Sequence, residues 1–135
     1  MVKIADLHAT MEGLFPERLG VRLVEAGAER VVGEIDVEAG HCTTPGIAHG
    51  GALMALADTC GAVCAFLNLP EGAIGTGTIE SKTNFLRAVR EGALTATTRP
   101  LHAGRTLIVV ETELALDDGR LAAKVSQSQA FLYAR

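Results

Sequence analysis

The stretch TTPGIAHGGALMALADTCGAVCAFLNLP, residues 43–70, is the most hydrophobic part of this chain and carries a single carboxylate, Asp58. Its apolar run over Gly50–Leu69 predicts one long helix, and the Asn, Pro and Gly residues within 68–72 are typical stop signals. The run is barely long enough to cross a membrane, and glycines and Asp58 interrupt it without basic anchors on either side. We therefore expect a buried core helix that carries one acid.

The composition of the 135-residue chain sets its broad class. Hydrophobic residues make up 48% and charged residues 21%, which indicates a globular chain, and the length suits a single domain over residues 1–135. A net charge of −4 without a basic cluster disfavours a nucleic-acid partner. The first residues lack the basic and apolar segments of a signal peptide, so we expect a cytoplasmic protein with reduced cysteines and no membrane association.

The segments outside the apolar run predict an α+β fold. Leu7, Met11 and Leu14 have helical spacing, so we expect a short amphipathic helix in the first fifteen residues. Residues 29–40, ERVVGEIDVEAG, alternate apolar and polar side chains as a half-buried antiparallel strand does. Four further strands, joined by turns at Ala103-Gly104 and Asp118-Gly119, are predicted over residues 77–88, 92–103, 105–116 and 120–134.

This order of elements predicts one antiparallel sheet wrapped around the central helix. At about 100° per residue, one apolar stripe of the helix should meet the sheet. Asp58 lies about 200° from this stripe, among small residues, so we expect a buried acid that faces away from the sheet. A structural carboxylate is the alternative for this acid. The stripe comprises Leu53, Leu56, Cys60, Val63 and Leu67.

The sequence His-Gly-Gly opens the same helix at His49. Gly50 and Gly51 would leave the first backbone N–H groups uncovered, and such a helix N-terminus can bind an oxyanion; a plain tight turn is the alternative. Gly50 and Asp58 are about 12 Å apart along the helix axis, so one helix cannot bring both to one carbonyl group. Two antiparallel copies related by a two-fold axis can, so the chemistry requires a dimer.

Three segments, HGGALMALADTCGAVCAF, TIESKTNFLRAV and HAGRTLIVVETEL, resemble the hotdog-fold acyl-CoA thioesterases, above all the phenylacetic-acid-degradation (PaaI-like) type. The resemblance extends from about Leu14 to Tyr133. It implies a hotdog fold, active sites at subunit interfaces, and homodimers that often pair into homotetramers. It also implies hydrolysis of an acyl-CoA thioester without a separate cofactor, because coenzyme A is part of the substrate. The few aromatic residues favour a small aryl or short-to-medium acyl group.

The resemblance also implies roles for individual residues. Asp58 would act as nucleophile or general base on the thioester carbonyl. The Gly50 amide would polarise that carbonyl, and His49 would lie beside it. Thr78 would sit near the acyl group or the attacking water. The remaining substrate-binding residues predicted in this way are Thr43, Gly51, Phe85, Gly104, Arg105 and Thr106.

The resemblance assigns some of these residues to the CoA part of the substrate, and at Thr43 the sequence departs from the family. Phe85 and the His102–Leu107 turn would lie along the CoA arm, where Arg105 is expected to meet phosphate groups. Thr43 departs from the family pattern, because many relatives carry Asn or Gln six residues before the histidine. A hydroxyl is shorter than an amide and both donates and accepts hydrogen bonds. This departure keeps open a second hypothesis, a non-catalytic acyl-CoA-binding hotdog protein.

Other uses of the same residue types are less favoured. His41, Cys42, His49, Cys60 and Cys64 could suggest a metal site, but their spacing fits no familiar zinc motif, and none is predicted. Cys60 belongs to the sheet-facing stripe, where a small buried hydrophobe is expected rather than a nucleophile. A hotdog hydratase would need an Asp/His pair in a different motif, which the sequence does not contain.

Overall fold

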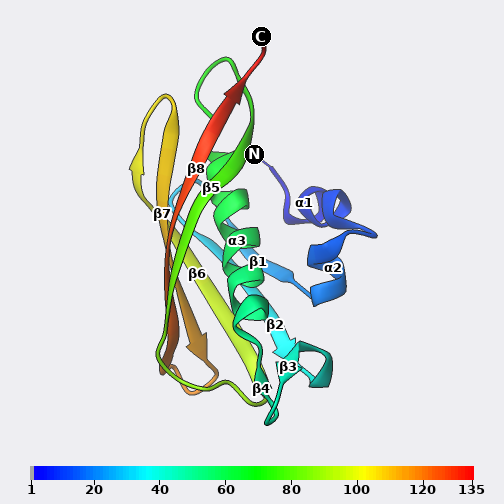
Figure 1. The fold of residues 1–135 in the computed structure, drawn as a ribbon. Coiled ribbons are helices and arrows are strands. Elements are labelled where there is room, and N and C mark those ends of the chain that lie inside the picture. The colour runs from blue at the N-terminus through cyan, green and yellow to red at the C-terminus, as the bar shows by residue number, and fades with distance from the viewer. Residues whose placement is uncertain (1) are drawn as a thin grey trace.

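One antiparallel sheet wraps one long helix in the computed structural model, which describes residues 2–135 (Figure 1). The helix is α3 (Gly50–Leu67), and Asn68 caps its C-terminus. Over the described residues the sheet has six strands in the order β1-β2-β6-β7-β8-β5, and each neighbouring pair is antiparallel. The predicted α+β architecture is confirmed. The strands are β1 (Arg22–Ala26), β2 (Val31–Val37), β5 (Ala73–Phe85), β6 (Gly92–Ala103), β7 (Leu107–Leu116) and β8 (Leu121–Tyr133).

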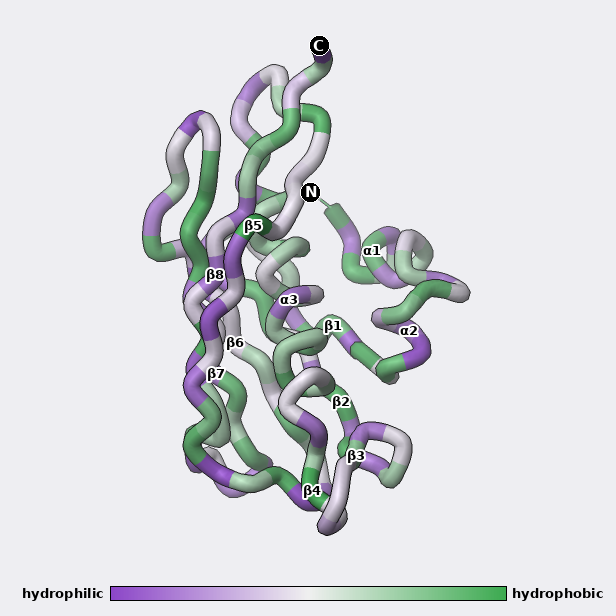
Figure 2. The backbone as a smooth tube through the Cα atoms, in the orientation of Figure 1, coloured by the Kyte–Doolittle hydropathy of each residue, from purple (hydrophilic) through white to green (hydrophobic). Residues whose placement is uncertain are grey.

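The predicted strands all exist; β6 has the predicted ends, and the other four are shifted at one or both ends. β2 is shorter than the alternating segment 29–40, and within it Ile35 and Val37 are buried while Asp36 is exposed, as the alternation predicted. β5 begins and ends earlier than the predicted segment 77–88. Sequence analysis did not single out β1, which pairs with β2 at the edge of the sheet. Buried positions alternate with more exposed ones along the long strands β7 and β8, because one face of the sheet covers the core. Figure 2 shows that hydrophobic and hydrophilic residues are mixed along the strands of the sheet.

The sheet covers more of α3 than the predicted stripe. The helix packs against β2 and against β5 through β8, so strands lie on more than one of its sides. Val63 and Leu67 of the stripe are only partly buried, which corrects the prediction. By length and composition alone α3 could cross a membrane, but this packing is that of the predicted core helix. The buried residues of α3 are Leu53, Leu56, Ala57, Cys60, Gly61, Cys64 and Ala65.

The N-terminal prediction of one helix is wrong in its extent. Two helices occur there, α1 (Ile4–Met11) and α2 (Phe15–Leu19), and α1 buries Leu7 and Met11 as predicted. Gly13, at φ +74°, turns the chain between them, a conformation that favours glycine. Leu14 therefore lies outside both helices and is exposed.

Candidate active site

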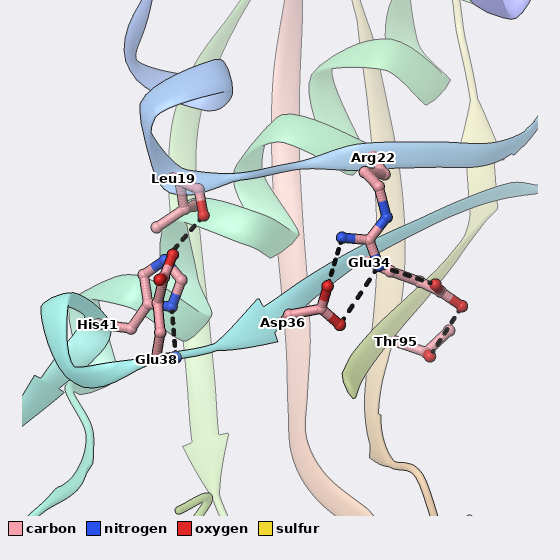
Figure 3. Close-up of polar contacts among 7 residues, drawn as sticks. All are labelled: Leu19, Arg22, Glu34, Asp36, Glu38, His41 and Thr95. Carbon is pink, nitrogen blue, oxygen red and sulfur yellow. Dashed lines mark hydrogen bonds and ion pairs between the residues drawn. The ribbon is translucent and has the colours of Figure 1, made fainter. Parts of the chain in front are cut away.

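The segment that leads into α3 is held in place by a buried histidine. It comprises η1 (Ala39–His41), β3 (Cys42–Thr43) and β4 (Ile47–Ala48). His41 Nδ1 accepts the Glu38 N–H at 3.2 Å, so its Nε2 carries the proton and donates to the Leu19 carbonyl at 2.8 Å (Figure 3). The His41 carbonyl in turn accepts the N–H of His49 at 2.8 Å. The start of the helix is thereby tied to α2.

The N-terminus of α3 offers one free backbone donor rather than two. His49 caps the helix, because its Nδ1 accepts the Gly51 N–H at 2.8 Å. The prediction that both glycine amides are uncovered is therefore wrong for Gly51. The Gly50 N–H has no acceptor among residues 2–135. Since His49 Nδ1 accepts, its Nε2 carries the proton and is a second possible donor near Gly50.

Gly50 also lies under an aromatic ring. A Cβ at this position would stand 2.9 Å from Cζ of Phe85, the last residue of β5. Only a residue without a side chain leaves the ring where it is. Phe85 and Gly50 line one cavity of about 410 Å³, together with Thr43 and Leu53. Three residues predicted to bind substrate or to polarise its carbonyl, Thr43, Gly50 and Phe85, thus share a cavity.

Asp58 points toward the sheet and not away from it. Its Oδ1 accepts hydrogen bonds from Thr78 Oγ1 of β5, at 2.7 Å, and from Gln127 Nε2 of β8. The prediction that Asp58 faces away from the sheet is wrong because the curved sheet buries more of α3 than the predicted stripe. The buried residues extend around the helix from Leu56 to Ala65, and Asp58 lies at the border of this buried surface. Asp58 is also exposed in the single chain, where a buried acid was predicted.

Asp58 and Thr78 line a second cavity, of about 370 Å³. Its other lining residues are Gly51, Met54, Ala55 and Ser81. The Ser81 hydroxyl oxygen is buried and has no hydrogen-bond partner in residues 2–135. Asp58 and Gly50 therefore open into different cavities of the chain.

Gln127 and Gln129 belong to this site, and sequence analysis missed them. Both side chains are buried, at 1% and 0% exposure, on the face of β8 that also carries Val125 and Phe131. Gln129 Nε2 donates to Thr78 Oγ1 at 2.7 Å. The available signal was the pattern VSQSQAF, in which two amides occupy positions that the alternation of the strand assigns to the core.

The predicted CoA-binding turn is not brought to Asp58 or Gly50 by this chain. Gly104, Arg105 and Thr106 connect β6 to β7, where the Gly104 N–H donates to the Leu107 carbonyl at 2.9 Å. Figure 1 shows this hairpin at the end of the sheet opposite the N-terminus of α3. Arg105 and Thr106 are exposed there.

The cysteines of α3 do not contribute a nucleophile. Burial raises the pKa of the Cys60 thiol to about 12 and that of Cys64 to about 11. Cys60 lies against Gly33 of β2, on the other side of the helix from Gln127. No three His, Cys, Asp or Glu side chains of residues 2–135 are grouped so that they could hold a metal ion.

A six-stranded antiparallel sheet wrapped around one central helix defines a hotdog fold, and the similar proteins show that the chain is a thioester hydrolase. Residues 45–123 match the family model of the Thioesterase superfamily, and the chain belongs to this family. The proofreading thioesterase EntH of Cronobacter sakazakii is 31% identical over 126 residues, which cover 93% of this chain and 91% of that protein.

Solved structures share the fold. A mutant of the thioesterase PA1618 from Pseudomonas aeruginosa superposes with a TM-score of 0.92 at 26% identity, covering 98% of this chain and 95% of that one. The protein smu.793 from Streptococcus mutans, solved with acetyl CoA bound, gives a TM-score of 0.77 at 22% identity, covering 85% and 90%. The second likeness concerns the fold alone.

Proposed function

We propose that this thioester hydrolase acts on acyl-CoA thioesters and that Asp58 is its nucleophile or general base. The observation that carries the proposal is the state of the Asp58 carboxylate: Oδ1 is held by hydrogen bonds, whereas no group of residues 2–135 donates to Oδ2. The carboxylate borders a cavity with few polar groups, which suits an acyl chain. The scarcity of aromatic residues in the chain favours a small aryl or short-to-medium acyl group, as in the phenylacetic-acid-degradation type.

The proposed reaction consumes one water. In the general-base form, Oδ2 of Asp58 takes a proton from water while the water oxygen attacks the thioester carbonyl carbon. The negative charge that develops on the carbonyl oxygen is stabilised by the Gly50 N–H and by His49 Nε2–H. The C–S bond then breaks, and the departing sulfur takes up the proton, giving a carboxylic acid and CoA. In the nucleophilic form, Oδ2 attacks the carbonyl carbon, and the C–S bond breaks to give an acyl anhydride of Asp58 and the CoA thiolate. Water then hydrolyses this anhydride, which gives the carboxylic acid, restores the Asp58 carboxylate and supplies the proton that the thiolate takes up.

We further propose that each site combines Asp58 of one chain with the Gly50 amide of a second copy. Two features support a dimer. Asp58 and Gly50 open into separate cavities, and their separation of about 12 Å along one helix is too large for one carbonyl group. In addition, β5 is the last strand of the sheet, so its outer edge has no partner strand in residues 2–135, and it exposes Ile74 and Ile79.

Mixed dimers test both parts of the proposal. One parent carries Asp58→Ala, and the other carries Gly50→Pro, which deletes the donor because proline has no N–H. Each parent alone should be inactive in an assay that detects the free thiol of CoA. A heterodimer has one site that lacks both groups and one intact site. Re-associated mixtures should therefore recover up to about half the wild-type rate per heterodimer.

Gly50→Ala is the matched control for the proline variant. It adds a Cβ against the Phe85 ring as proline does, but it keeps the N–H group. It should remain active if the N–H, rather than the space, is required. An inactive mixture, with folded parents and heterodimers established by mass spectrometry, would refute the cross-subunit site. An active Asp58→Ala parent would refute the role of Asp58 itself.

A further inference from the structure

Two buried amides are linked to one oxygen of Asp58, Gln127 by a direct hydrogen bond and Gln129 through the Thr78 hydroxyl. Gln127 Nε2 donates directly to Oδ1 and also lies 3.3 Å from Thr78 Oγ1. Gln129 Nε2 donates to Thr78 Oγ1 at 2.7 Å, and Thr78 Oγ1 donates to Oδ1 at the same distance. Thr76 Oγ1 donates to Gln129 Oε1 at 3.2 Å. Every bond of this network leads toward the carboxylate.

Which group donates in each of these hydrogen bonds follows from the chemistry of the groups that it joins. A carboxylate that is ionised only accepts, so both Thr78 and Gln127 must donate to it. The single hydroxyl proton of Thr78 is then committed to Asp58, and Thr78 can only accept from Gln129. The side-chain amide of Gln127 cannot be flipped, because its Oε1 would then face the carboxylate oxygen of Asp58. Chains of this kind polarise one another, which strengthens the last bond to Asp58.

The cost of this arrangement distinguishes it from ordinary core packing. Gln127 and Gln129 are almost fully buried, and Gln127 Oε1 has no partner in residues 2–135. A buried polar group without a partner destabilises the folded chain. The helix also makes room for the amide, since a Cβ at Gly61 would stand 2.0 Å from Gln127 Oε1. An apolar side chain of the same size would fill the space without these costs.

We propose that Gln127 and Gln129 are positioning residues for Asp58. They hold Oδ1 so that Oδ2 alone faces the substrate cavity, and Gln129 acts through Thr78. This inference rests on the proposed function of Asp58. It assigns to the last strand of the sheet a role in orienting the acid that the central helix carries.

Methionine variants separate positioning from packing, because methionine nearly preserves the shape of glutamine and removes its N–H donors. Gln127→Met should lower kcat at least about tenfold, because a hydrogen bond to a charged group is lost. KM for a good acyl-CoA substrate should change by less than about threefold, and Tm should stay or rise, because the unpaired Oε1 is also removed. Gln129→Met should lower kcat by about threefold to tenfold, since it acts through one intermediate hydroxyl.

A buried pair elsewhere in the sheet is the control. Thr98 and Thr112 share a hydrogen bond of 2.7 Å between β6 and β7, and both are buried. Replacing both with valine removes a buried polar contact that does not reach Asp58. This double variant should keep the wild-type kcat, whatever its Tm.

The outcomes separate the inference from the function on which it rests. Wild-type kcat in Gln127→Met, with Asp58→Ala inactive, would overturn the positioning role and leave the role of Asp58 intact. If Gln127→Met does not fold, wild-type kcat in Gln129→Met would overturn the inference. A kcat loss in the Thr98/Thr112 variant equal to that in Gln127→Met would also overturn it, because any buried polar contact would then have the same effect. Wild-type activity in Asp58→Ala would instead refute the proposed function.

Discussion

Two consecutive residues of α3, Cys60 and Gly61, meet the sheet on different flanks of the helix, and both contacts depend on a glycine. On the β2 flank the glycine belongs to the strand, and a Cβ at Gly33 would stand 2.6 Å from Cys60 Sγ. On the β8 flank the glycine belongs to the helix, and a Cβ at Gly61 would stand 2.0 Å from Gln127 Oε1. In both places the helix and the sheet approach closely.

What fills the space differs between the flanks. The β2 flank encloses a thiol whose pKa is raised to about 12 by burial, so it stays neutral and unreactive at physiological pH. The β8 flank encloses the amide of Gln127, which donates to Asp58 at the border of the buried surface of the helix. A glycine that lets the helix and the sheet approach closely therefore contributes to the core on the β2 flank and to the candidate active site on the β8 flank. Mutations at the two glycines should have different consequences.

The largest effect is expected from Gly61→Ala. Its Cβ displaces the end of the Gln127 side chain, which can move only by releasing Asp58. We expect kcat to fall at least about tenfold, as in Gln127→Met, and the free energy of unfolding to fall by about 1–3 kcal/mol. Steady-state kinetics and urea unfolding measure the two quantities. Adding Gln127→Ala should restore part of the stability without restoring kcat; wild-type kcat in Gly61→Ala would show that the amide is not needed.

Gly33→Ala should reduce stability and leave catalysis unchanged. The added Cβ meets a buried sulfur that has no room to move, so we expect the free energy of unfolding to fall by about 1–3 kcal/mol. The kcat of the folded protein should match the wild type. In a Cys60→Ala background, Gly33→Ala should lower the free energy of unfolding by less, because the sulfur that the added Cβ would meet is absent. A kcat loss as large as that of Gly61→Ala would contradict the difference between the flanks.

The smallest effect is expected from the buried thiols of Cys60, on the β2 flank, and Cys64. Their pKa values are raised in the folded chain, to about 12 for Cys60 and about 11 for Cys64, from an ordinary value of 9.0. Only the unfolded chain ionises them near pH 9, so stability is complete below that pH and is lost as pH rises toward 12. At pH 9 each thiol should lower the free energy of unfolding by about 0.4 kcal/mol relative to pH 7. Urea unfolding at both pH values should show a smaller loss in a Cys60→Ala/Cys64→Ala variant; an equal loss would contradict this origin.

Sequence analysis located the central helix, every strand of the six-stranded sheet except β1, and the candidate acid, because these depend on local patterns. Alternation over residues 29–40 predicted β2, and the apolar run predicted α3, since the period of side chains along an element is a local property. The break between α1 and α2 at Gly13 was missed, because helical spacing continued across it in Leu14. Strand ends also shifted, as the pairing partner decides where a ladder begins.

The sequence by itself therefore determined the fold class and singled out Asp58 and the glycines that open α3. Only the tertiary structure decided the direction of Asp58, because that depends on how far the sheet curves round the helix. It also decided which groups meet the acid. Gln127 lies 69 positions from Asp58 in the chain, and a period-two pattern indicates the face of a strand but not the helix residue opposite each position. Contacts between distant segments follow from strand order and register, which the folded chain sets as a whole.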